Sequence, residues 1–141
     1  MPFNVENATA WEICMNIGLV LAGGMAKGAY EVGALKALEE FIPKNEIKYM
    51  SCSSIGTLNG YAYITDRMDW MDSVWDTICG DKDRQIFTRV LRSDLLDRKI
   101  DELDLGSDEI KPVFYTSMLD LGRKQINYKD ISNVPPEKRR E

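Results

Sequence analysis

The feature that most constrains the fold is a pattern of apolar run, tight turn and helix that occurs twice in succession. The first apolar run, Ile17–Ala22, is partly β-branched and ends at Gly23 and Gly24, which suits a strand buried on both faces. Helical spacing of apolar residues then extends from Ala26 to Ile42, and Pro43 stops it. The pattern predicts a strand, a glycine turn and a helix.

The same plan follows at once in the next segment. Ile47–Cys52 predicts a second strand, Ser53 and Ser54 a sharp turn, and Ile55 to Thr65 a second helix. A strand–helix–strand crossover implies parallel strands, and such strands imply an α/β sheet covered by helices on both faces, in three layers. Both turns then leave the same edge of the sheet, where open α/β sheets place their sites. We expect the two turns to face each other.

The remainder of the chain predicts two more helices and a β-hairpin. These elements are the helices Trp70–Ile78 and Arg89–Leu103 and the strands Pro112–Ser117 and Arg123–Tyr128, with Asp120–Gly122 as the turn. Neither a repeat nor a linker divides the 141 residues. We expect one domain or part of one, with residues 1–16 as a short N-terminal extension.

Composition excludes several classes of protein. The net charge of −5 and the pI near 4.9 argue against nucleic-acid binding, because phosphate contacts need a surplus of Lys and Arg. No apolar run reaches the roughly 18 residues of a membrane span, and the first residues lack the basic and then apolar order of a signal peptide. We expect a cytoplasmic protein that makes peripheral contact with membranes.

The counts of histidine and cysteine restrict the chemistry further. The chain has no histidine, which excludes a Ser-His-Asp triad, a Cys-His pair and a His-ligated metal within it. Its three cysteines, Cys14, Cys52 and Cys79, are widely spaced and are interpreted as reduced, buried, small hydrophobic residues. A hydrolase built on this chain therefore needs a base other than histidine.

The serine turn has the layout of a nucleophile elbow. Its residues are Cys52, Ser53, Ser54, Ile55 and Gly56, where a strand turns abruptly into a helix and lifts a serine hydroxyl clear of the sheet. The amino end of the helix points its free N–H groups and its positive dipole end at Ser54, where they stabilise an alkoxide or oxyanion. The alternative is that Ser53 or Ser54 only caps the helix, as serines commonly do.

The glycine turn supplies a loop of backbone N–H groups at the start of a helix, an arrangement that binds anions. Its residues are Gly23, Gly24, Met25, Ala26, Lys27 and Gly28. It lacks the ending of a Walker loop and the full GxGxxG of dinucleotide-binding proteins, so nucleotide binding is the weaker alternative. Another alternative is a tight turn that only allows close packing of the helix on the sheet at Gly28 and Gly33.

Together, these motifs resemble the patatin-like phospholipase family, whose domains begin with a glycine-rich oxyanion loop followed by Lys or Arg and Gly. The segment Leu19–Leu35 is similar to that opening, and Ser54–Gly60 is similar to the family's elbow from the serine onward. Met25 stands where the family usually has Gly, and Cys52 replaces the first Gly of the elbow. These two turns must therefore have backbone angles that Met and Cys tolerate.

The resemblance implies a lipid acyl hydrolase that acts on phospholipids or other acyl esters without a metal or cofactor. It implies Ser54 as the nucleophile, N–H groups of Gly23 to Gly28 as the oxyanion hole, and an Asp that acts directly as the base in a Ser-Asp dyad. The family's Asp precedes Gly, and no Asp-Gly dipeptide occurs here. The resemblance therefore implies that residues 1–141 are the N-terminal part of one patatin-like domain, truncated on the C-terminal side of its sheet. We expect the base to lie beyond this chain and residues 1–141 alone to be inactive. The alternative is a catalytically inactive patatin-like module that binds lipid or a protein partner.

Overall fold

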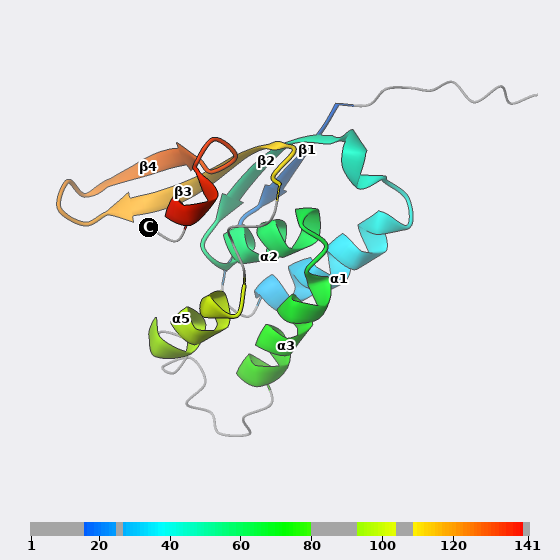
Figure 1. Cartoon of the computed structure of the whole chain (residues 1–141), viewed down its shortest axis with the longest axis horizontal. Coiled ribbons are helices and arrows are strands. Elements are labelled where there is room, and N and C mark those ends of the chain that lie inside the picture. Colours follow the sequence, from blue (N-terminus) through cyan, green and yellow to red (C-terminus); the bar gives the residue numbers. More distant parts are fainter. Residues whose placement is uncertain (1–15, 25–26, 80–92, 104–108, 140–141) are drawn as a thin grey trace, which may run out of the picture.

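The computed structural model describes residues 16–24, 27–79, 93–103 and 109–139. They form a four-stranded sheet in the order β1-β2-β3-β4, with helices beside it (Figure 1). The strands are β1 Ile17–Leu21, β2 Ile47–Ser53, β3 Val113–Asp120 and β4 Gln125–Asp130. The α-helices are α1 Lys27–Glu39, α2 Ile55–Ile64, α3 Met68–Cys79 and α5 Ser93–Asp101, and short 3-10 helices cover Lys44–Glu46 and Pro136–Lys138. The expected α/β class is confirmed.

The topology brings the ends of three strands to one edge of the sheet. α1 connects β1 to β2, and these strands pair in parallel because a helical crossover returns the chain to the same end of the sheet. β3 is also parallel to β2, whereas β4 runs antiparallel to β3. Leu21 lies opposite Cys52, and Ser53 lies opposite Ser117. The carboxyl ends of β1 and β2 are therefore level, and β3 continues past them to Asp120.

The core lies between the helices and one face of the sheet. Its most deeply buried large side chains are at most 1% exposed and come from β2, β3, α2 and α3: Met50, Phe114, Tyr63 and Met71. α2 packs on β1 and β2 and also contacts α1 and α3. Figure 1 shows α1, α2, α3 and α5 on the same side of the sheet. α2, which follows the serine turn, is thus the central helix of this layer.

The opposite face of the sheet is exposed in the described part of the chain. Val20 is 78% exposed, Tyr49 57% and Tyr115 44%, and these side chains come from three neighbouring strands. Sheets of parallel strands are normally covered on both faces. The described residues thus supply the sheet and one helical layer of the three expected layers.

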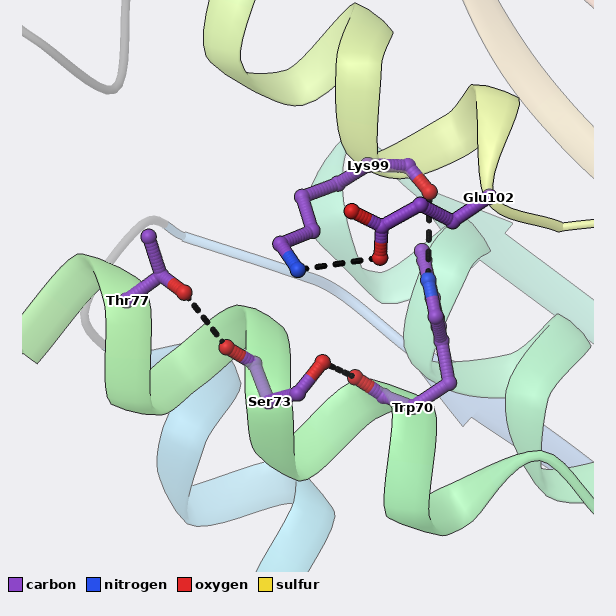
Figure 2. Close-up of polar contacts among 5 residues, drawn as sticks. All are labelled: Trp70, Ser73, Thr77, Lys99 and Glu102. Atoms are coloured by element: carbon purple, nitrogen blue, oxygen red, sulfur yellow. Dashed lines mark hydrogen bonds and ion pairs between the residues drawn. The ribbon is translucent and has the colours of Figure 1, made fainter.

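Polar contacts attach α5 to α3 (Figure 2). The indole Nε1 of Trp70 on α3 donates to the Lys99 carbonyl oxygen on α5 at 3.1 Å, and Lys99 Nζ forms an ion pair with Glu102 at 2.9 Å. Within α3, the Ser73 hydroxyl donates to the Trp70 carbonyl oxygen and the Thr77 hydroxyl to that of Ser73. The Trp70 bond thereby joins two helices that are separated along the chain.

The observed boundaries differ from the predicted ones by a few residues. α1 ends at Glu39 instead of Ile42, because the residues before Pro43 form tighter turns: the Phe41 N–H donates to the Leu38 carbonyl oxygen at 3.0 Å. Residues 1–15 of the expected N-terminal extension and residues 89–92 of the expected fourth helix lie outside the described residues. In the part of the chain that is described, no helix combines the length and apolarity that a membrane crossing requires.

Candidate active site

The glycine turn and the serine turn meet at the carboxyl ends of β1 and β2, as expected. A Cβ atom added to Gly23 would lie 2.4 Å from the Ser53 carbonyl oxygen and 3.3 Å from Ser54 Cβ. A Cβ atom added to Gly56 would lie 2.6 Å from the Leu21 carbonyl oxygen and 3.0 Å from the Gly23 nitrogen. The two turns therefore touch through their backbones, and glycine is required at both contact positions.

Ser54 has an unusual backbone conformation between β2 and α2. Its φ is 53° and its ψ is −134°, a combination that residues with a side chain seldom adopt. Such strain persists only where the surrounding structure enforces it, and it is concentrated at functional sites. The Ser54 side chain is exposed and makes no capping hydrogen bond to α2. Ser54 is therefore not an ordinary capping serine, and the turn has the sharp strand-to-helix form of a nucleophile elbow.

The N-terminus of α2 lies directly after Ser54. The Thr57 N–H donates to the Ser54 carbonyl oxygen at 2.9 Å and closes the first turn of the helix. Ile55 and Gly56 are the first two residues of α2. The first N–H groups of a helix have no carbonyl oxygen one turn earlier in the helix to which they could donate. These N–H groups and the helix dipole favour negative charge beside Ser54.

The neighbouring serine is in a different environment. The Ser53 hydroxyl accepts a hydrogen bond from the Ser117 hydroxyl on β3 at 2.8 Å. Thr57 on α2 and Thr116 on β3 form a second hydroxyl pair, also at 2.8 Å. The two pairs connect the elbow and the start of α2 to β3, and the first of them occupies the hydroxyl of the half-buried Ser53. The Ser54 hydroxyl has no hydrogen-bond partner among the residues that the structure describes.

The glycine turn begins with two left-handed residues. Gly23 has a φ of 71° and Gly24 a φ of 106°, which favour glycine. The Lys27 N–H donates to the Gly24 carbonyl oxygen at 3.2 Å, and the Gly23 N–H donates to Glu31 Oε1 at 3.0 Å. The Gly23 N–H is thus already satisfied within the protein. The two predicted loop residues that lie outside the described part of the chain are Met25 and Ala26.

Gly28, at the start of α1, allows close packing of helices. A Cβ atom there would lie 2.5 Å from Trp75 Cζ2 and 2.9 Å from Ile55 Cγ2. A Cβ atom at Gly33 would meet nothing within 4 Å. Gly28 therefore allows close packing against two helices and not against the sheet as predicted, and the packing interpretation is wrong for Gly33.

Cys52 is a buried strand residue beneath the elbow. Its side chain is 2% exposed, and its φ is not in the left-handed region. Burial, and after it the charge of the Glu31 carboxylate, raises the pKa of the Cys52 thiol to about 12. The thiol is therefore protonated at neutral pH and is a poor nucleophile. The backbone at this position accepts a side chain where the family usually has glycine.

Glu31 and Asn59 belong to the site, although the sequence alone did not single them out. Asn59 is completely buried on α2, and its Nδ2 donates to Glu31 Oε2 at 3.0 Å and to the Gly28 carbonyl oxygen at 2.9 Å. The sequence did contain one indication of this role, which is an Asn within a helix of apolar and small residues. An Asn that is buried with such neighbours requires hydrogen-bond partners for its amide. That signal does not identify the partner.

The described carboxylates offer no base in contact with Ser54. Asp120, in the sequence context closest to an Asp-Gly turn, lies at the end of β3, and its Oδ1 accepts the Arg123 N–H at 2.9 Å. Asp120 pairs with Gln125 as the last residue of β3, so it flanks the hairpin turn and is not part of that turn as predicted. Both carboxylate oxygens of Glu31 accept hydrogen bonds from Gly23 and Asn59. The described residues also contain no group of three or more His, Cys, Asp or Glu that could hold a metal ion.

The fold and the two turns define an α/β protein with a serine elbow beside a glycine turn. The sequence profile of the family described as patatin-like phospholipase matches residues 19–136, which include both turns, β3 and β4. The chain belongs to the patatin-like phospholipase family, a family of lipid acyl hydrolases. No curated protein and no solved structure matches the chain.

Proposed function

We propose that the chain carries the nucleophile of a serine-dependent lipid acyl hydrolase of the phospholipase A or esterase type, and that this nucleophile is Ser54. The observation that carries the proposal is the conformation of Ser54. Its φ is left-handed, and its exposed side chain makes no capping hydrogen bond at the N-terminus of α2. A capping serine would have extended backbone angles and a hydrogen bond to the helix. Membership of a lipid acyl hydrolase family supports the same assignment.

In the proposed reaction, Ser54 Oγ attacks the carbonyl carbon of a phospholipid or other acyl ester. The carbonyl oxygen takes up negative charge, and N–H groups of the glycine turn after Gly23 and of Ile55 donate to it. One such donor contributes about 3–4 kcal/mol in other acyl-transfer sites. The proton of the Ser54 hydroxyl passes to the base during the attack. The tetrahedral intermediate then expels the alcohol, which takes up this proton, and leaves an acyl group on Ser54. Water hydrolyses this ester and restores the hydroxyl.

We also propose that the base is an aspartate supplied from outside residues 1–141. Two observations support this: no Asp-Gly dipeptide occurs in the chain, and Asp120 is engaged in the hairpin turn. General-base assistance contributes about 10²–10⁴-fold to a reaction of this type. Without the base, Ser54 would remain a weakly activated hydroxyl.

Hydrolysis of a short p-nitrophenyl ester and of phosphatidylcholine tests the proposal. The enzymes are the 141-residue chain and a version extended through an Asp-Gly-Gly segment, each with Ser54 and with Ser54→Ala. We expect the extended version to be active only with Ser54 and the 141-residue chain to be slower by about 10²–10⁴-fold. Turnover that persists in the extended Ser54→Ala variant would exclude Ser54 as the nucleophile. Full Ser54-dependent turnover by the short chain would point to an internal carboxylate.

A second candidate function is a catalytically inactive patatin-like module that binds lipid or a protein partner. The observation that favours it is the lack of a hydrogen-bond partner for the Ser54 hydroxyl among the described residues. A binding module would associate with phosphatidylcholine vesicles and hydrolyse nothing in either version, and Ser54→Ala would leave binding unchanged. Ser54-dependent release of fatty acid from the same vesicles would reject it.

A further inference from the structure

A buried hydrogen-bond network joins three helices beneath the two turns. Its centre is Asn59 on α2, which is 0% exposed. Asn59 Nδ2 donates to the Gly28 carbonyl oxygen at 2.9 Å and to Glu31 Oε2 at 3.0 Å, both on α1. Asn59 Oδ1 accepts from the Trp75 indole Nε1 on α3 at 3.4 Å. The amide thus uses both donor hydrogens and its acceptor, and its orientation is fixed by three partners.

Glu31 extends this network to the glycine turn. One carboxylate oxygen accepts from Asn59, and the other accepts the Gly23 N–H at 3.0 Å. A hydrogen bond to an ionised acceptor is roughly twice as strong as one between neutral groups. Gly23 in turn touches the backbone of Ser53 and Gly56 on the elbow. One carboxylate therefore binds the helix that follows the serine turn and also the loop that faces it.

We infer that Glu31, held by Asn59, is a positioning residue that fixes the glycine turn relative to Ser54. The turn begins with two left-handed glycines, which have more conformational freedom than any other residue and need an external restraint. The catalytic consequence rests on the proposed function, because donors displaced by 1 Å can slow a reaction by about 10²-fold. The restraint itself is a property of the fold.

The position requires a carboxylate and not an amide. Both neighbours of the Glu31 side chain, the Gly23 N–H and Asn59 Nδ2, are hydrogen-bond donors. A carboxylate accepts at both oxygens, whereas the amide of Glu31→Gln would place its own NH₂ group against one of these donors. Glu31→Gln therefore keeps the shape of the side chain but breaks one link. Glu40→Gln is the matched control, since Glu40 is an exposed carboxylate just after α1.

Nuclear magnetic resonance of the 141-residue chain tests the restraint without catalysis. In the parent protein, the Gly23 amide should show a coupling through its hydrogen bond to the Glu31 carboxylate carbon. In Glu31→Gln only one of the two donors keeps its acceptor, so solvent exchange of either the Gly23 amide or the Asn59 side-chain amide should be about ten- to a hundredfold faster, whereas Glu40→Gln should match the parent at both amides. An absent coupling in the parent, or equal exchange in the two variants at both the Gly23 amide and the Asn59 side-chain amide, would overturn the inference. The parent measurement is decisive even where Glu31→Gln does not fold.

Fluorophosphonate labelling of the extended version tests the catalytic consequence. At a temperature where both variants are fully folded, Glu31→Gln should lower the bond-forming rate constant about ten- to a hundredfold relative to Glu40→Gln. Affinity for the probe and the pH profile should be unchanged. Equal rates in the two variants would overturn the positioning role, and a lost limb of the pH profile would identify Glu31 as a base instead. If the parent does not label at all, the proposed function fails, and the amide measurement still decides the restraint.

Discussion

Gly56→Ala is the most informative single change to the contact between the two turns. The added Cβ would lie 2.6 Å from the Leu21 carbonyl oxygen and 3.0 Å from the Gly23 nitrogen, whereas ordinary contacts begin at 3.4 Å. Both neighbours are backbone atoms, so neither can rotate away, and the end of β1 or the glycine turn must move. Forcing an extra carbon into a packed interior destabilises a protein by about 1–3 kcal/mol. We expect a loss of this size in the free energy of unfolding.

Gly33→Ala is the matched control on α1. The added Cβ meets nothing within 4 Å, so alanine should stabilise the helix by about 0.5–1 kcal/mol. Urea unfolding followed by tryptophan fluorescence measures both variants, and their unfolding free energies should differ by roughly 1.5–4 kcal/mol. A Gly56→Ala protein at least as stable as Gly33→Ala would refute the close approach of the two turns.

Two further changes test the surroundings of the site. Because the Cys52 thiol pKa is raised from 9.0 to about 12, its thiolate fraction at pH 8 is about a thousandfold below that of an unfolded thiol. In a Cys14→Ser/Cys79→Ser background, iodoacetamide should therefore modify Cys52 only after unfolding, and fast modification of the folded chain would contradict its burial. The exposed sheet face should make the 141-residue chain associate, and Val20→Lys with Tyr115→Lys should shift sedimentation toward monomer; unchanged association would place the contact elsewhere.

The two strand–turn–helix units could be predicted from the sequence because their signals are local. Apolar runs bounded by glycine or serine turns locate β1 and β2 within a residue or two, and the crossover rule then predicts parallel pairing. The ends of the hairpin strands were harder to predict from the sequence. β3 continues to Asp120 and β4 begins at Gln125, because pairing between these strands, which no local pattern encodes, decides where they end.

The site shows the same division between local and long-range information. The serine turn follows from its position between a strand and a helix, but the left-handed φ of Ser54 can only be seen in the structure. Glu31 resembles any polar residue on a helix until the fold brings it to Gly23 and Asn59. The exposure of Val20 likewise depends on which segments cover the sheet, and periodicity does not report this.

Fluorophosphonate labelling with the modified residue mapped by mass spectrometry is the most direct test of Ser54 as the nucleophile. In the extended version, the probe should modify Ser54, because the helix terminus and strained turn favour the charged transition state at that hydroxyl. Labelling should persist in Ser53→Ala, whose hydroxyl is bonded to Ser117, and disappear in Ser54→Ala. A Ser54→Ala protein that labels like the parent, together with a Ser53→Ala protein that does not label, would show that the assignment has the wrong serine.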